Sequence, residues 1–306
     1  MSHARAVAPE RWLDSFAAMD SRPCLLTVHA HPDDEASKGA GTVARYRSEG
    51  VHTVLVCCTG GEEGEILNPA MDRPEVRDNL HEVRIQELAR AAEIIGYAEV
   101  VMLGYRDSGM ADTEANSHPD NFANAPLDEA VDRLVAVIRR ERPQVIITYP
   151  DDQGLYQHPD HLRVHDISVP AFERAGDSSH RPDLGEAWAP SKLYYSMWSH
   201  RRIGARHAAF LEHGLESPYD ERWFDHPSQD HRITTQIAIH DHVTARVEGL
   251  RAHATQVDPE SPFWFGLPEQ VEHSIHPFDD YVLAIGPTPT ELPERDLFSG
   301  IAVSTR

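Results

Sequence analysis

The stretch Val28-His29-Ala30-His31-Pro32-Asp33-Asp34-Glu35 changes within eight residues from an apolar run to a set of imidazole and carboxylate groups. Residues 25–28 are predicted to form a short buried strand, and residues 38–47 carry apolar side chains at helical spacing. The polar groups therefore lie where a strand ends and a helix begins, the place where ligands collect in open α/β sheets. Proline and acids also suit an ordinary helix start, so this stretch alone does not establish a site.

A second stretch, Gly154-Leu155-Tyr156-Gln157-His158-Pro159-Asp160-His161, repeats the pattern after another apolar run at 145–149. The His-Pro pair occurs five times in the chain and by itself indicates little. These two copies differ from the others because each follows a predicted strand and adds a potential ligand three residues on, Asp34 and His161. Two imidazoles and one carboxylate leave a coordination position open, which is typical of catalytic zinc sites.

Predicted strands and helices alternate along most of the chain. We expect strands at 25–28, 51–58, 100–103, 145–149, 192–198, 233–239 and 281–285, and helices at 38–47, 80–95, 127–140, 161–174 and 243–255. Strands that are apolar throughout and alternate with helices are typical of a parallel sheet covered on both faces. The sequence therefore predicts an α/β fold. The edge of the sheet at the carboxyl ends of the strands is expected to hold His31, Glu65, Asp107 and His158 together.

Composition narrows the class of partner. The chain has 50 acidic and 28 basic residues, a formal net charge of -22, whereas phosphate recognition needs clustered Lys and Arg. We therefore expect neither nucleic acid nor an anionic membrane as a partner. Three cysteines form no CxxC pair, and no apolar run approaches the roughly 20 residues of a bilayer span. With no signal peptide evident, these features predict a soluble protein of the reducing cytoplasm.

The two His-Pro stretches together predict a metal-dependent hydrolase. Zinc held by His31, Asp34 and His161 would lower the pKa of bound water to about 7, although Fe²⁺ also suits this ligand set. Asp33 cannot point in the same direction as Asp34 and is therefore free to act as general base. A protonated His158 could stabilise the tetrahedral oxyanion. Asp160 could orient one of the imidazoles through its second ring nitrogen.

Alternative ligands remain open at this stage. His29 would share a face with His31 while the strand persists, so it could replace His31 as a ligand. His165 lies one helical turn beyond His161, although a solvated position on the helix explains it as well. A protein that binds glycan or metal without catalysis is a further alternative, whereas the absence of a GxSxG elbow argues against a serine hydrolase of the α/β-hydrolase type.

At the level of motifs, His31-Pro32-Asp33-Asp34-Glu35 and His158-Pro159-Asp160-His161 resemble the paired signatures of the zinc-dependent glucosamine N-deacetylase (LmbE-like / PIG-L) superfamily. Within it, the chain is most similar to the amidases of mycothiol S-conjugates. That closer similarity rests on three segments: Ser37-Lys38-Gly39-Ala40, Gly61-Glu62-Glu63-Gly64-Glu65-Ile66-Leu67-Asn68-Pro69-Ala70-Met71 and Leu250-Arg251-Ala252-His253-Ala254-Thr255-Gln256.

The resemblance implies a Rossmann-like, mostly parallel sheet in a single α/β domain over 1–306. It divides this domain into an N-terminal extension (1–22), a catalytic core (24–176) and a C-terminal α/β extension (177–306) that completes the substrate cleft. The same metal ligands, base and oxyanion partner follow from it. It further implies that the substrate is bound by Lys38, Glu65, Arg84, Asp107 and Tyr156.

The implied reaction is hydrolysis of the amide in mycothiol S-conjugates, which releases a mercapturic acid and glucosaminyl-inositol for detoxification. Deacetylation of N-acetylglucosaminyl-inositol, or processing of a thiol-tagged natural product, is the alternative. The expected partner is thus a small thiol-sugar conjugate, and the oligomeric state is left open. The sequence departs from the family pattern in two places: the run Gln153-Gly154-Leu155-Tyr156-Gln157, and Glu63 where the amidases commonly have Arg. Both affect the expected substrate cleft and leave the metal ligands unchanged.

Overall fold

The computed structural model describes residues 22–154 and 156–301. Residues 1–21 of the expected N-terminal extension lie outside this range. Among the described residues, no helix has both the length and the apolar character required to cross a bilayer.

Seven strands of the described chain form one sheet in the order β3-β2-β1-β4-β5-β7-β6. Their bounds are β1 (Cys24–His29), β2 (His52–Thr59), β3 (Glu99–Tyr105), β4 (Val145–Thr148), β5 (Lys192–Met197), β6 (Thr235–Ala238) and β7 (Phe278–Ile285). The first five in chain order pair in parallel, and β7 runs antiparallel to both β5 and β6. The strand order reverses direction between β1 and β4, and a crevice opens at such a switch point in α/β folds.

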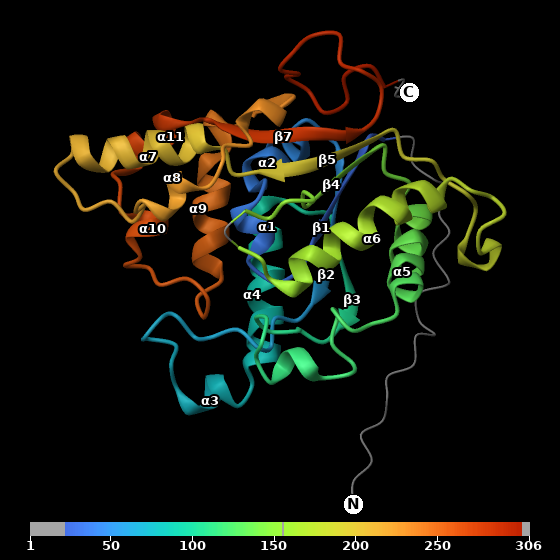
Figure 1. The fold of residues 1–306 in the computed structure, drawn as a ribbon, viewed down its shortest axis with the longest axis horizontal. Coiled ribbons are helices and arrows are strands. Elements are labelled where there is room, and N and C mark those ends of the chain that lie inside the picture. The colour runs from blue at the N-terminus through green and yellow to red at the C-terminus, as the bar shows by residue number, and fades with distance from the viewer. Residues whose placement is uncertain (1–21, 155, 302–306) are drawn as a thin grey trace, which may run out of the picture.

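Helices cover both faces of the sheet (Figure 1). On one face lie α5 (Leu127–Glu141) and α6 (Pro159–Ala175); on the other lie α1 (Asp34–Ser37), α2 (Ala40–Ser48), α4 (Leu80–Ile95) and α9 (Val243–Ala252). Four further helices, α7 (His200–Glu212), α8 (Arg222–Asp225), α10 (Pro262–Phe265) and α11 (Glu269–Ile275), gather beyond α9 in Figure 1, and α3 (Pro74–Arg77) lies apart from them. The predicted mostly parallel α/β fold is therefore confirmed.

Alternation along the strands builds two separate cores. Leu26 and Val28 of β1 pack into the core under α5 and α6, whereas Leu25 packs into the core under α2 and α9. Cys58 of β2 packs into the core under α5 and α6, whereas Cys57 packs on the opposite face with Leu88 and Ala92 of α4, as expected for neighbours on a strand. Burial raises the pKa of both thiols well above the ordinary value, so these cysteines serve as small core residues.

Three local features differ from the sequence prediction. The helix expected at 38–47 begins at Ala40, because Gly39 has a φ of 98° and separates α1 from α2. Strand β3 lies at the edge of the sheet and is not covered along its whole length, since Val100 remains 38% exposed. The sequence also indicated none of the helices α7, α8, α10 and α11. The last three have only four to seven residues, and the buried face of α7 includes Arg202 and Arg206, which interrupt an apolar pattern.

Candidate metal centre and active site

The turn after β1 places three acidic residues at the switch point. Asp33 adopts a φ of 111°, and its carbonyl accepts hydrogen bonds from Ala36 N and Ser37 N as α1 begins. This sharp turn buries the Asp34 side chain, while Asp33 keeps 30% of its side-chain surface exposed. The two adjacent carboxylates therefore occupy different environments, as the sequence predicted.

Three donor atoms converge from two parts of the chain that are remote in sequence. Asp34 Oδ2 lies 3.4 Å from His31 Nδ1 and 3.3 Å from His161 Nε2, and all three side chains are buried. Tetrahedral nitrogen and oxygen ligands about 2.05 Å from a zinc ion are about 3.3 Å apart. The donor set thus has the spacing and chemistry of a site that could hold a divalent metal.

The second nitrogen of His31 faces further carboxylates. His31 Nε2 lies 3.1 Å from Asp160 Oδ2 and 3.6 Å from Asp107 Oδ1. Asp160 is itself fixed by Ser108, whose backbone N donates to Oδ2 at 3.0 Å and whose hydroxyl donates to Oδ1. This arrangement leaves Nδ1 of His31 directed toward Asp34, the geometry by which carboxylates orient metal-binding imidazoles.

The electrostatics of the cluster favour a cation. Burial alone would lower the pKa of His31, but Asp107, Asp160 and Asp34 outweigh burial and raise that pKa well above its ordinary value. Burial lowers the pKa of His161 to about 4, so this ring is neutral at pH 7 and has a free lone pair for a metal. Asp34, Asp107 and Asp160 thus lie around His31 while His161 is neutral, and a bound positive ion would offset the negative charge of these carboxylates.

Asp33 lies beside this cluster and has its own support. Arg84, which is buried, donates to Asp33 Oδ2 at 3.1 Å and to the carbonyls of Pro32 and Gly61. Burial of Asp33 raises its pKa to about 6, against the opposing effect of Arg84. A carboxylate with a pKa near 6 is ionised at neutral pH and is still basic enough to accept a proton.

A buried ion pair holds the backbone of Asp33 in place. Glu35 Oε2 accepts a hydrogen bond from Asp33 N at 2.9 Å, and Glu35 Oε1 lies 2.5 Å from His253 Nε2. Glu35 and His253 are both fully buried although they are 218 positions apart. The sequence analysis quoted the segment that contains His253 without giving His253 this role. The signal in the sequence was Glu35, an acid next to Asp33 and Asp34 to which no role had been assigned.

His158 forms the N-cap of α6. Its Nδ1 accepts a hydrogen bond from Asp160 N at 3.1 Å, and its ring centroid lies 4.5 Å from that of His31. Burial lowers the pKa of His158 to about 4, so the ring is neutral at pH 7, whereas the sequence interpretation considered its protonated form. With Nδ1 occupied as an acceptor, Nε2 carries the proton and can still donate a hydrogen bond.

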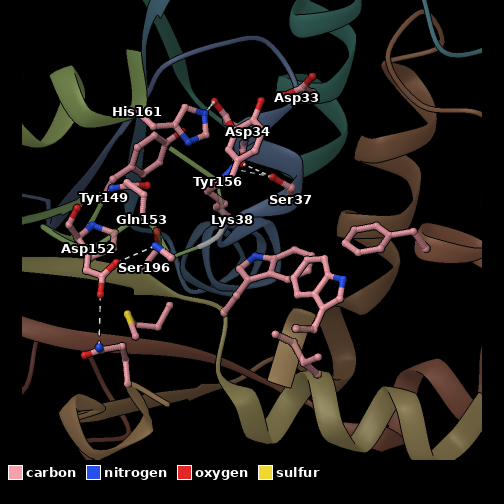
Figure 2. Close-up of a pocket in the computed structure, with 18 of the residues that line it drawn as sticks. Asp33, Asp34, Ser37, Lys38, Tyr149, Asp152, Gln153, Tyr156, His161 and Ser196 are labelled. Carbon is pink, nitrogen blue, oxygen red and sulfur yellow. Dashed lines mark hydrogen bonds and ion pairs between the residues drawn. The ribbon is translucent and has the colours of Figure 1, made fainter. Parts of the chain in front are cut away.

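The residues expected to bind substrate fall into two groups. Lys38 and Tyr156 line a cavity of about 500 Å³ that also reaches Asp33, Asp34 and His161 (Figure 2). Lys38 forms an ion pair with Asp34 and lies 5.4 Å from the ring of Tyr149, a cavity residue that the sequence did not single out.

The other three expected substrate contacts do not line that cavity. Asp107 is buried beside His31, and the imidazole holds the pKa of Asp107 well below its usual range although burial alone would raise it. Arg84 is occupied by Asp33 and by backbone carbonyls. Glu65 is exposed, and the structure does not bring its side chain to the cluster of His31, Asp107 and His158.

The two alternative imidazoles lie apart from the metal donors. His29 is buried with Nδ1 3.2 Å from the hydroxyl of Tyr149, and burial lowers its pKa to about 4. His165 is half-buried, and its Nδ1 donates to the carbonyl of Tyr149 at 3.2 Å. The described residues bring together two groups of potential metal donors, His31 with Asp34 and His161, and His31 with Asp107, His158 and Asp160, and neither alternative imidazole belongs to them.

Sequence comparison shows which known enzymes this chain is similar to. A model of the PIG-L family, described as GlcNAc-PI de-N-acetylase, matches residues 26–172. The mycothiol S-conjugate amidase of Streptomyces coelicolor is 44% identical over 286 residues, which cover 90% of this chain and 97% of that protein. The 1D-myo-inositol 2-acetamido-2-deoxy-alpha-D-glucopyranoside deacetylase of Geodermatophilus obscurus is 40% identical over 290 residues, with coverage of 90% and 97%.

Structural comparison agrees on the fold. The N,N'-diacetylchitobiose deacetylase of Pyrococcus horikoshii superimposes with a TM-score of 0.58 over 85% of this chain and 83% of that one, at 16% identity. At such low identity the likeness establishes the architecture alone.

Proposed function

This chain belongs to the PIG-L family of amide-bond hydrolases, and from that premise we propose that it is a zinc-dependent amidase of mycothiol S-conjugates. The products would be a mercapturic acid, which is an N-acetylcysteine S-conjugate, and glucosaminyl-inositol. The observation that carries the proposal is the 44% identity to a mycothiol S-conjugate amidase over almost the whole of both chains. The role would be the removal of electrophiles that have already reacted with the thiol of mycothiol.

We assign the metal to His31, Asp34 and His161, since Nδ1 of His31 and Nε2 of His161 lie 3.4 and 3.3 Å from the same oxygen of Asp34. When bound, zinc supplies Lewis acidity that makes water a competent nucleophile near neutral pH. Asp33 takes a proton from the attacking water and passes it to the departing amine nitrogen as the C–N bond breaks. The neutral Nε2–H of His158 donates to the carbonyl oxygen as negative charge develops there. Asp160 keeps His31 oriented.

For substrate contacts, Lys38 and Tyr156 are the candidates within the cavity. Asp107 and Arg84 would position residues of the site instead, since Asp107 faces His31 and Arg84 faces Asp33. Glu65 would contact substrate only at the outer rim, because its side chain is exposed and outside the cavity lining.

Deacetylation of N-acetylglucosaminyl-inositol is the second candidate, because relatives named for that activity reach 40% identity with similar coverage. The two reactions cleave an amide on the same sugar and differ in the acyl group. Values of kcat/KM for purified protein with a mycothiol S-conjugate and with N-acetylglucosaminyl-inositol separate them. We expect the conjugate to be preferred; a preference for the acetylated sugar would overturn the proposal.

Metal content tests the assigned ligands independently of activity. We expect His161→Ala to lose the metal, measured by elemental analysis after purification, because two donors remain. His165→Ala is the matched control, since His165 lies one turn further along α6 and belongs to neither donor group. Retention of zinc by His161→Ala, or its loss from His165→Ala, would show that the assignment is wrong. The same analysis distinguishes zinc from iron.

A further inference from the structure

The cavity beside the candidate metal centre has two chemically different ends. Polar side chains gather near the metal donors, as the labelled residues of Figure 2 show, and aromatic rings lie on another side of the same cavity. The apolar end is lined by Met197, Trp198, Ile203, Trp223, Leu250, Val257, Phe263 and Trp264. We call the part formed by Trp198, Trp223, Phe263 and Trp264 the aromatic chamber.

The rings of the aromatic chamber pack against one another in fixed orientations. Trp198 and Phe263 stack with centroids 5.7 Å apart and an interplanar angle of 6°. Trp264 meets both edge-on, at 5.9 Å from Trp198 and 4.7 Å from Phe263. Trp223 lies 5.7 Å from Phe263 at 34°. All four side chains are only half-buried, so apolar ring surface remains uncovered at the cavity.

A group of charged residues contacts the aromatic chamber and the residues next to it. The guanidinium of Arg202 lies 4.8 Å from the ring of Trp198. Arg206 donates to the carbonyl of Phe263 at 3.0 Å and to the hydroxyl of Tyr219 at 2.7 Å. Both Arg206 and Arg246 form ion pairs with Glu272 of α11. These contacts hold the ring of Trp198 and the backbone of Phe263 before any ligand binds, which lowers the entropic cost of binding.

The chemistry of the aromatic chamber fits one part of the proposed substrate better than the other. A hydroxylated sugar-inositol needs hydrogen-bond partners around its ring, and each polar group left unpaired on burial is costly. The chamber itself consists of aromatic rings, and the same cavity is lined by the apolar Met197, Ile203, Leu250 and Val257 as well as by the polar His200, His226 and Gln229. Planar apolar groups gain both burial and ring contacts in such a place.

We propose that the aromatic chamber is the subsite for the group carried on sulfur, and that it selects conjugates of flat, apolar electrophiles. This inference rests on the proposed amidase function, because only an acyl half that bears a sulfur substituent can extend into the chamber. A cavity of about 500 Å³ lies within the range of pockets that enclose compact ligands. An acetyl group would leave the chamber unused.

The test compares two conjugates that differ in the sulfur substituent alone, S-(naphthylmethyl)mycothiol and S-methylmycothiol, with N-acetylglucosaminyl-inositol as a third substrate. Wild-type protein should give a higher kcat/KM with the naphthylmethyl conjugate. Trp223→Ala should reduce the ratio of the two conjugate kcat/KM values about tenfold, since it removes a ring contact and apolar area. Trp223→Phe should retain most of the ratio because it retains a ring.

Phe224→Ala is the matched control, because Phe224 is the next residue of α8, is 40% exposed and does not line the cavity. It should leave the ratio unchanged. A thermal melt checks each variant, and Trp223→Leu replaces Trp223→Ala in the same comparison if the latter does not fold. An equal loss with both conjugates would overturn the subsite and assign the chamber to the shared sugar half. Cleavage of the acetylated sugar without either conjugate would instead defeat the amidase function, and the subsite with it.

Discussion

Asp33 combines an unusual backbone with a reactive position. Its φ of 111° is rare for a residue other than glycine, and it is maintained by the Glu35 carboxylate on its N–H and by Arg84 on its side chain. Two buried groups from different elements therefore fix one carboxylate beside the metal donors. Backbone strain of this kind persists where the surroundings determine it, and it is often found at functional sites.

Asn at position 33 keeps the size of the side chain and tolerates positive φ, but it cannot accept a proton. We expect Asp33→Asn to lower kcat by about 100- to 10,000-fold while the protein retains its metal. Rates with the preferred substrate and metal analysis on the same sample check this.

The control for Asp33→Asn is Asp112→Asn. Asp112 also has a positive φ, of 65°, but it is exposed and belongs to neither group of potential metal donors. It should behave as wild type. If Asp33→Asn lost the metal, the roles of Asp33 and Asp34 would have to be exchanged.

At the scale of elements, Gly39 separates α1 from α2 and lets Lys38 lie at the cavity while α2 packs on the sheet. A Cβ at this position would lie 2.9 Å from the hydroxyl of Tyr281, which is buried and donates to Thr42 Oγ1. The left-handed conformation alone costs an L-residue about 1–2 kcal/mol.

We expect Gly39→Ala to lower the free energy of unfolding by more than that conformational cost, because the fixed Tyr281 adds a steric clash. Gly50→Ala supplies the control, since Gly50 has a φ of 87° and open space around its Cβ position. Denaturant unfolding of both variants measures the difference. Equal losses would mean that Tyr281 moves aside without cost.

Asp280 on β7 joins β6, β7 and the start of α7. Burial would raise its pKa, but hydrogen bonds from His276, Ser199 and Gln236 outweigh burial and hold the pKa below its usual value. Because the folded pKa is the lower one, the stabilisation is present above the unfolded pKa of about 3.9 and is lost as pH falls through the folded pKa.

The stability advantage of wild type over Asp280→Asn should therefore be largest above about pH 5 and shrink at lower pH. Urea unfolding at a series of pH values gives this difference directly. Asp225→Asn, at an exposed position of α8, is the control and should show a much smaller change. A constant advantage across the range would contradict the assigned hydrogen bonds.

At the scale of the whole molecule, Lys192 and Glu294 attach the C-terminal segment to the sheet. Lys192 is fully buried on β5, and its Nζ donates to Glu294 Oε1 at 2.6 Å and to the hydroxyl of Tyr194 at 3.0 Å. The other oxygen of Glu294 accepts from Tyr194 at 2.8 Å and from Thr235 at 3.0 Å. This buried cluster thus links β5 and β6 to Glu294, which lies 102 positions after Lys192 and 59 after Thr235.

Lys192→Met should lower the free energy of unfolding by about 3–5 kcal/mol, because it leaves the carboxylate of Glu294 buried without its cation. The double variant Lys192→Met/Glu294→Gln should recover much of that loss, since the uncompensated charge is gone. Arg90→Met, which breaks an exposed pair with Glu93, should cost less than about 1 kcal/mol. Thermal and denaturant unfolding distinguish these outcomes, and a double variant no more stable than the single one would contradict them.

The sequence by itself determined the alternation of strands and helices and the two polar turns, because burial periodicity and ligand spacing are local properties of the chain. From them came the mostly parallel sheet and the candidate donors His31, Asp34 and His161. Only the tertiary structure decided which groups meet across long distances: Asp160 with His31, His253 with Glu35, and Trp223 with Phe263. It also left Glu65 outside the cavity and His158 neutral, since contacts, burial and pKa depend on neighbours that no local pattern specifies.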